Sequence, residues 1–264
     1  IASKASLLKL KQFDTTIIDE ASQILEPMLI GMLPYFKRFV LIGDHKQLPA
    51  VVLQDKSRSA VEDKALNKIG LYNRRNSLFE RLYNQARENK WTWAFDQLHH
   101  QGRMHEDICC FPSAHFYNNE LKLLPAELPI SVWQKEALGY KLPTNASQLE
   151  QVLSKNRMLF FNSTVNRFRN PKTNLDEAQI VGQIISSFDA IYKANNKVLK
   201  PEDVGVITPF RAQIAQIRSV LTQHGQGYEN CTIDTVERYQ GGAREIIIIS
   251  LCLNDAYQLE SIIS

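Results

Sequence analysis

The hydrophobic residues of this chain gather in short runs that alternate with amphipathic segments. Continuous apolar runs at 15–20 (TTIIDE) and 38–44 (RFVLIGD) predict two strands, and the segment between them has helical character before its second proline. Apolar runs of this length, without polar alternation, are typical of parallel strands that helices cover on both faces. We therefore predict a strand, a helix and a second strand at the beginning of the chain.

The same patterns recur along the rest of the chain. Helical patterns occur at 57–70, 76–88, 104–117 (broken or kinked near Pro112), 175–195 and 211–225, where Gly225 ends the helix. Apolar runs predict strands at 91–98, 157–163, 203–209, 231–236 and 245–251. Residues 119–156 contain three prolines and predict a long irregular excursion. The alternation predicts an α/β fold with parallel sheets covered by helices, divided into units 1–96 and 97–264.

Composition adds little to this picture. A chain of 264 residues with 44% hydrophobic residues can bury a substantial core, and a net charge of +3 permits only a local basic patch. Four cysteines without CxxC spacing, and no apolar run long enough for a membrane, predict an intracellular, cytoplasmic protein with reduced thiols. Three histidines precede Cys109, but no second ligand pair follows, so packing is favoured over zinc binding.

Adjacent carboxylates end the first predicted strand. Asp19 could hold a magnesium ion through its water shell, and Glu20 could orient or deprotonate an attacking water, which is the logic of a Walker B motif. An apolar run followed by Asp-Glu is also common as a helix cap or a surface pair. The pair alone does not decide between these alternatives.

A second polar cluster ends the next predicted strand. Gly43 allows a tight turn, and Asp44, Lys46 and Gln47 follow in a short loop closed by Pro49. A neutral amide such as that of Gln47 can sense a terminal phosphate or position a water. If the two clusters are unrelated, this is only a polar turn.

Three further candidates lie at later strand ends. Arg103, in LHHQGRMHEDI, could reach the transition-state charge of a phosphoryl transfer, although an isolated arginine is more often part of a surface ion pair. The segments VGVITPFRAQ and TIDTVERYQGGAREIIIIS place Thr, Gln, Gly and Arg where hydroxyls and backbone amides suit phosphate contacts. Phe210 could offer a base-stacking face, or it could belong to the core.

In order along the chain, IIDEAS, GDHKQLPAV, QGRMHEDI, VGVITPFRAQ and TVERYQGGAREIIIIS resemble motifs II, III, IV, V and Va of superfamily 1 helicases. The similar branch is the one that contains the nonsense-mediated-decay RNA helicase and its bacterial DNA-helicase relatives. The resemblance spans most of the chain and implies an incomplete first RecA-like domain (1–96) followed by most of a second (97–264). It also implies ATP and Mg²⁺ as cofactors and movement along single-stranded nucleic acid, with DNA favoured over RNA.

The resemblance also implies roles for individual residues. Asp19 matches the magnesium ligand, Glu20 the catalytic base, Gln47 the γ-phosphate sensor and Arg103 an arginine finger, and Gln101 belongs to the same nucleotide-contacting motif as Arg103. Thr208 and Thr235 match positions near the nucleic-acid backbone. Gln240 and Gly241 match the Gln-Gly before the final strand, which we expect at the nucleotide.

The chain also departs from the family pattern. Gly102 stands where relatives carry an aromatic residue that stacks on the base, and Ala243 stands where they carry a glutamate that touches the nucleotide. Neither a G-x-x-x-x-G-K-[ST] loop nor the final Ala-Leu-Thr-Arg-Ala motif occurs in the sequence. We therefore expect the interior of a longer helicase, which by itself hydrolyses little or no ATP. The alternatives are a non-catalytic module that binds nucleic acid or a partner, and a metal-dependent nuclease that uses Asp19, Glu20 and Asp44.

Overall fold

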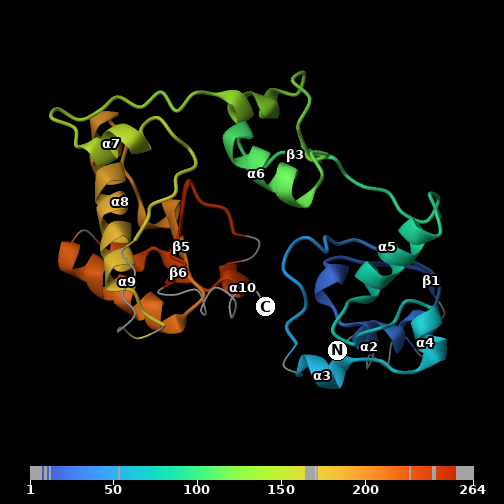
Figure 1. Cartoon of the computed structure of the whole chain (residues 1–264). Helices are drawn as coiled ribbons and strands as arrows, with labels where there is room; N and C mark the ends of the chain where they lie inside the picture. The colour runs from blue at the N-terminus through green and yellow to red at the C-terminus, as the bar shows by residue number, and fades with distance from the viewer. Residues whose placement is uncertain are drawn as a thin grey trace. The chain divides into compact units, whose positions relative to one another are not determined.

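The structure is a computed structural model that describes residues 8, 11, 13–52, 54–163, 170, 172–225, 227–239 and 242–253 of the chain. Internal contacts divide the chain into two units, which Figure 1 shows in one picture. The first unit contains Ile1–Gln101 and Phe111–Lys122, and the second contains Gly102–Cys110 and Leu123–Ser264. Each unit has a parallel sheet with helices packed on it, which confirms the predicted α/β class.

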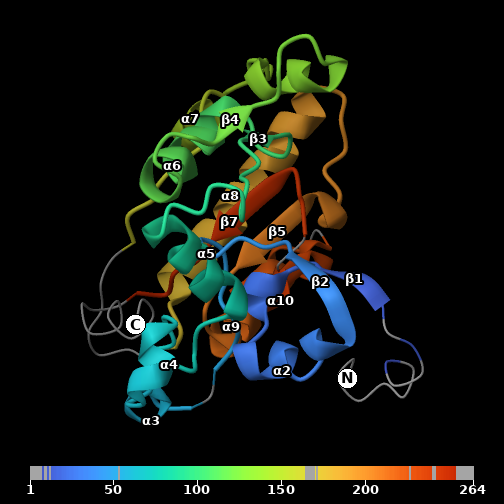
Figure 2. The ribbon, with the colours of Figure 1, turned by 90° about the vertical axis from the view of Figure 1, so that its right-hand side faces the viewer.

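The first unit is built around the two strands predicted at the beginning of the chain. Its elements are β1 (Phe13–Ile18), η2 (Ala21–Gln23), α2 (Glu26–Ile30), η3 (Leu33–Tyr35), β2 (Phe36–Leu41), α3 (Lys56–Ser59), α4 (Lys64–Lys68), α5 (Leu78–Glu88) and β3 (His100–Gln101). β1 and β2 are parallel, in a register that runs from Phe13 opposite Phe36 to Ile18 opposite Leu41 (Figure 2). Both strands therefore end at the same edge of the sheet.

The helices of the first unit are positioned by a small core and one buried ion pair. Ile18, Ala21, Leu29 and Leu78 form the fully buried cluster. The side chain of Ser77 caps α5 by accepting a hydrogen bond from the Glu80 amide at 3.1 Å. α5 is joined to α2 by a two-pronged contact, in which Arg81 donates from Nε and Nη2 to the Glu26 carboxylate at 2.8 and 2.5 Å.

The second unit is larger. Its elements are η4 (Pro129–Lys135), α7 (Gln148–Leu153), α8 (Leu175–Ala194), η5 (Pro201–Asp203), β5 (Val204–Ile207), α9 (Arg211–His224), η6 (Tyr228–Asn230), β6 (Thr232–Asp234), α10 (Val236–Tyr239) and β7 (Ile246–Ile249). Two elements cross the division between the units, namely α6 (Glu106–Phe116) and β4 (Lys122–Leu123), and β4 pairs with β3.

The sheet of the second unit has the order β6-β5-β7, and all its pairs are parallel. The central strand sends Val204 and Val206 to the face that α8 and α9 cover, where they join a core that includes Ile185 and Ile217 (Figures 1 and 2). At Gly205 the opposite face has no room for a side chain, because an added Cβ would lie against the Tyr239 side chain. This strand is buried on both faces, as its apolar run predicts.

Several sequence predictions are wrong in detail. Residues 91–98 and 157–163 form no strand, because they are turns and extended chain without a strand partner among the described residues. The helix predicted at 57–70 is two short helices, α3 and α4. Of the break or kink predicted near Pro112, the break does not occur, because Pro112 lies inside α6. The excursion contains η4 and α7, and a capping box between Ser147 and Glu150 begins α7.

Burial of β1 and β2 is also less complete than the apolar runs predict. Ile17 has 67% of its surface exposed, and Phe39, Val40 and Ile42 are exposed as well. These side chains have no covering layer within the described part of the chain. No helix among the described residues combines the length and the hydrophobicity needed to cross a membrane. All four cysteines carry free thiols.

Candidate active site and nucleic-acid interface

The predicted magnesium ligand Asp19 and the predicted catalytic base Glu20 lie in the turn that follows β1, and both are exposed. Asp19 accepts the Glu20 amide through Oδ1 at 2.9 Å, and Glu20 accepts the side-chain amide of Gln23 through Oε2 at 2.7 Å. Glu20 has φ of 52° and ψ of 34°, a left-handed conformation that costs a residue other than glycine roughly 1–3 kcal/mol. The chain thus turns sharply at Glu20, the carboxylate predicted to orient or deprotonate the attacking water.

Direct contacts tie this turn to the end of β2. The Ala21 amide donates to the Ile42 carbonyl at 2.8 Å, and the Ile42 amide donates to the Ile18 carbonyl at 2.8 Å. The Asp44 amide donates to the Ser22 hydroxyl at 3.2 Å. A Cβ added to Gly43 would lie 2.9 Å from the Ser22 nitrogen, so the two turns approach as closely as glycine allows. The two polar clusters are therefore neighbours in space.

The Asp44 carboxylate organises the loop after β2. Its Oδ1 accepts the Lys46 amide at 2.9 Å, and its Oδ2 accepts both Gln47 Nε2 at 2.9 Å and the Tyr117 hydroxyl at 2.6 Å. Gln47 itself is exposed. Because protein donors occupy both oxygens of Asp44, this carboxylate is poorly suited to be a third metal ligand. No metal-binding group of three His, Cys, Asp or Glu side chains occurs among the described residues.

His45 faces the helical side of this loop. Its ring lies 4.9 Å from the Tyr83 ring and 6.4 Å from the Phe79 ring, both of α5. Burial, followed by the nearby Lys46 ammonium, lowers the pKa of His45 below its ordinary value of 6.5. A neutral imidazole therefore packs on α5 at neutral pH, and the loop is anchored on its apolar side as well.

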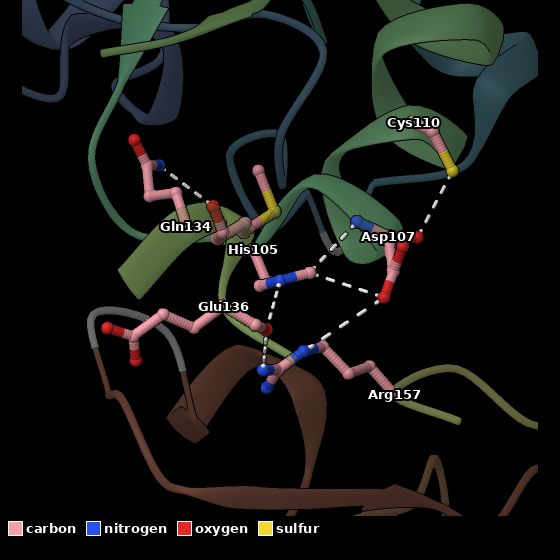
Figure 3. A network of polar contacts seen from close by, with 7 residues as sticks. His105, Asp107, Cys110, Gln134, Glu136 and Arg157 are labelled. Atoms are coloured by element: carbon pink, nitrogen blue, oxygen red, sulfur yellow. Dashed lines mark hydrogen bonds and ion pairs between the residues drawn. The ribbon is translucent and has the colours of Figure 1, made fainter. Parts of the chain in front are cut away.

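Polar contacts hold the segment around Arg103 in the second unit (Figure 3). The fully buried Gln134 donates from Nε2 to the Met104 carbonyl at 2.9 Å and accepts the Leu124 amide at 3.1 Å. The His105 ring accepts the Asp107 amide at Nδ1 (3.2 Å), which leaves Nε2 to donate to the Glu136 carbonyl at 3.0 Å. His105 thus has a structural role, which agrees with the packing alternative favoured from the sequence. Arg103, which directly follows Gly102, is exposed.

The neighbours of Arg103 account for one departure from the family pattern. Gln101 is half-buried in β3. A Cβ added to Gly102 would lie 2.9 Å from Cδ1 of Leu124, so the leucine fills the space that a side chain at position 102 would enter. Base stacking by residue 102 therefore does not occur in this chain.

The predicted nucleic-acid residues lie at the carboxyl edge of the second sheet. Thr208 is fully buried, its amide donates to the Asp234 carbonyl at 3.2 Å, and its hydroxyl has no hydrogen-bond partner among the described residues. Phe210 and Thr235 are half-buried, and the Thr235 amide donates to Asp234 Oδ1 at 2.8 Å. Gln240 and Gly241 lie outside the described residues.

A buried polar network fixes the same edge. Gln213 of α9 donates from Nε2 to the Asn174 carbonyl at 2.9 Å and to the Ser250 hydroxyl at 3.2 Å. Ser250 donates to Glu177 Oε2 at 2.7 Å, and the same oxygen accepts the Cys252 amide at 2.9 Å. Helices α8 and α9 and the end of β7 are thereby joined where the predicted phosphate contacts lie.

Sequence reasoning missed a hollow of about 410 Å³ beside these residues. Arg211, Arg218 and Arg238 line it together with Asp234 and apolar residues of α9 and β6. All three arginines are exposed, and Arg218 also donates to the Glu229 carbonyl. Arg211 and Arg218 are seven residues apart, which places them on one helix face, but only the fold brings Arg238 to the same place.

Sequence comparisons with known proteins identify the family of the chain. Family models described as AAA domains match residues 74–260 and residues 1–55. The DNA replication ATP-dependent helicase/nuclease DNA2 of Bos taurus is 31% identical over 256 residues, which cover 91% of this chain and 22% of the relative. The chain belongs to the superfamily 1 helicases.

The names of other relatives of this superfamily 1 helicase chain refer to different nucleic acids. The DNA polymerase alpha-associated DNA helicase A of Schizosaccharomyces pombe is 33% identical, with coverage of 92% of this chain and 33% of the relative. The 3'-5' exoribonuclease HELZ2 of Mus musculus is 30% identical, with coverage of 94% and 7%. The chain thus spans a third or less of the length of these relatives.

Proposed function

We propose that the gene product containing this chain is an ATP-dependent helicase or translocase that couples ATP hydrolysis to movement along single-stranded nucleic acid. One observation carries the proposal. Asp19 and Glu20 are exposed in a strained turn that is hydrogen-bonded to the neighbouring loop bearing Gln47. In parallel sheets, groups at the carboxyl ends of adjacent strands are placed to act on one ligand.

The side chains of this edge suit a magnesium nucleotide. Mg²⁺ takes one or two protein carboxylates and completes its shell with water and phosphate oxygens, so the exposed Asp19 suffices as the protein ligand. When bound, the ion supplies positive charge that neutralises the phosphates. Glu20 is the base that takes a proton from the attacking water, and its left-handed backbone turns the carboxylate out of the β1 strand direction.

We assign the remaining nucleotide contacts to Gln101, at the end of a segment of the first unit, and to residues of the second unit. Arg103 acts on the charge that develops at the transferred phosphoryl group, and Gln101, Gln240 and Gly241 contribute nucleotide contacts. Gln134 and His105 support this role, because they fix the backbone on the C-terminal side of Arg103. In this proposal the units correspond to parts of two RecA-like domains, one ending and the other beginning near residues 96–97.

Nucleic acid binds at the carboxyl edge of the second sheet. Thr235 and Phe210 are half-buried there and available for backbone and base contacts, whereas Thr208 acts through the end of β5 because its hydroxyl is buried. The three arginines of the hollow add positive charge for phosphates. We favour DNA over RNA, since two of the three relatives named above are DNA helicases.

ATP turnover by the full-length gene product, with and without a single-stranded oligonucleotide, tests the proposal. Glu20→Gln keeps the size of the side chain and removes its basicity, so we expect turnover to fall by about 10²- to 10⁴-fold. Asp19→Asn should lower turnover and raise the Mg²⁺ concentration needed for half-maximal rate. Asp14→Asn is the matched control, because Asp14 is an exposed carboxylate of β1 whose partner is Lys37.

The outcomes separate the rival functions. Wild-type turnover by Glu20→Gln would overturn the proposal. Oligonucleotide binding without any ATP hydrolysis by the full-length protein would favour the non-catalytic binding module instead. DNA or RNA cleavage that requires metal but not ATP would favour a nuclease.

A further inference from the structure

A tyrosine far in sequence from the Gln47 loop makes a hydrogen bond within it. Tyr117 directly follows α6 and lies 73 residues from Asp44 in sequence, yet its hydroxyl donates to Asp44 Oδ2 at 2.6 Å. Gln47 Nε2 donates to the same oxygen at 2.9 Å. Both residues lie in the first unit. We propose that Tyr117 is a positioning residue of the active site, which acts through Asp44 to hold the Gln47 amide with its oxygen toward the attacking water.

The Asp44 carboxylate determines which end of the Gln47 side-chain amide faces it. An ionised carboxylate can only accept hydrogen bonds, so the end of Gln47 that faces Asp44 must be the NH₂ group. The two ends of a planar amide point apart, and Oε1 is therefore directed away from Asp44. An acceptor there can bind an O–H of water, whereas a sensor that donates to a phosphate oxygen requires the opposite orientation.

Tyr117 is suited to keep this arrangement in place. Burial, followed by its hydrogen bond to Asp44, raises the pKa of Tyr117 above its ordinary value of 10.0, and a hydrogen bond from Gln47 opposes this rise. The phenol therefore stays protonated at neutral pH and donates to the carboxylate. With the Lys46 amide on Oδ1 and Tyr117 on Oδ2, the carboxylate is held at both oxygens.

This inference rests on the proposed ATPase function and assigns a complementary task to each side chain. One hydrogen of the attacking water is accepted by Gln47 Oε1, and the other proton passes to Glu20 as the water oxygen bonds to the γ-phosphorus and the bond to ADP breaks. Tyr117 touches neither water nor nucleotide. It should therefore influence the rate of the chemical step and leave nucleotide affinity unchanged.

Steady-state ATP hydrolysis by the full-length gene product tests the inference. Tyr117→Phe removes one oxygen, and we expect kcat to fall roughly 10-fold while KM for ATP stays within about 2-fold. Tyr72→Phe is the matched control, because Tyr72 is an exposed tyrosine of the same unit. Asp44→Asn, which can face Gln47 with either a donor or an acceptor, should lower kcat to a similar extent. The double variant should be no worse than Asp44→Asn alone, since the two residues act in series.

The results distinguish failure of the inference from failure of the proposed function. If Glu20→Gln loses activity but Tyr117→Phe has wild-type kcat, the positioning role is wrong and the ATPase proposal stands. Losses that multiply in the double variant, or a rise in KM as large as the fall in kcat, would also overturn it. If the wild-type protein does not hydrolyse ATP, the proposed function fails first. Should Tyr117→Phe not fold, wild-type kcat in Asp44→Asn would by itself overturn the inference.

Discussion

The two parallel sheets of the molecule are stabilised in different ways. In the second unit, β5 is covered on both faces and contributes to a core that has fourteen buried members among the described residues and that α8 and α9 complete. In the first unit, β1 and β2 leave apolar side chains such as Ile17 and Val40 exposed, and the part of this unit that the structure describes has a buried cluster of four residues. The carboxylates proposed to act on ATP nevertheless belong to the first unit, which has the smaller core in the described part of the chain.

The difference indicates that polar contacts replace apolar burial around the proposed active site. The Glu26–Arg81 pair joins the helices, and the Asp44 carboxylate joins the Gln47 loop to Tyr117. Polar contacts are directional, so they fix the geometry of a loop in a way that a few apolar contacts cannot. The following variants test whether the two units depend on different forces, in order of decreasing effect.

Removal of one partner of the buried ion pair should have the largest effect. The side chains of Arg81 and Glu26 are only 10% and 4% exposed, so Arg81→Ala leaves a buried carboxylate without its cation. We expect the free energy that protects the α5 amides from hydrogen exchange to fall by about 3–5 kcal/mol. Lys37→Ala, which breaks the exposed pair with Asp14, should change it by less than about 1 kcal/mol. Equal effects of the two variants would contradict the role of buried polar contacts.

A cavity in the core of the second unit should destabilise that unit. Ile185 of α8 is almost completely buried among apolar side chains, and Ile185→Ala should cost about 2–5 kcal/mol of stability. Hydrogen exchange should show this loss in the α8 and α9 amides and not in those of α5. A loss shared by both units would show that their stabilities are coupled.

The arginine-lined hollow of the second unit is the proposed site of phosphate contacts with nucleic acid. If Arg238 contacts a phosphate, Arg238→Ala should lower the slope of log K against log salt concentration for a single-stranded oligonucleotide by about 0.7. Lys155→Ala, an exposed cation elsewhere in the second unit, is the control. An unchanged slope for Arg238→Ala would remove the hollow from the interface.

A pH effect at His45 should be the smallest. Because the pKa of His45 is lowered by folding, the unfolded chain binds a proton first as the pH falls through 6.5, and the first unit loses stability below that pH. His45→Phe keeps the ring packing on Tyr83 without the titration. Hydrogen-exchange protection of α5 at pH 7.5 and 5.5, corrected for intrinsic rates, should therefore differ more in the wild type than in this variant. Equal differences would show that His45 is not the titrating group.

Part of this organisation could be predicted from the sequence. Apolar runs located β1, β2, β5, β6 and β7, because strands that pair in parallel sheets require them. The same criterion failed at 91–98 and 157–163, where Trp93 and Phe160 are 83% exposed and no described residue pairs with the segment as a partner strand. Composition alone cannot reveal whether a partner exists.

The sequence singles out the candidate site residues but not the residues that support them. Asp19, Glu20 and Gln47 stand out because they follow apolar strands. Tyr117 and Gln134 were missed, since a hydrogen bond between residues 73 or 30 positions apart leaves no local pattern. The left-handed backbone of Glu20 has no local signal either, because glutamate does not favour that conformation.

The central claim is that the turns after β1 and β2 form one half of an ATP site and act together. Gly43→Ala tests it most directly, because the added methyl would lie 2.9 Å from the Ser22 nitrogen and separate the two turns. ATP turnover by the full-length gene product should fall on the order of 10²-fold, while oligonucleotide binding and the α8 hydrogen exchange stay at wild-type levels. Wild-type turnover by a folded Gly43→Ala protein would contradict the account.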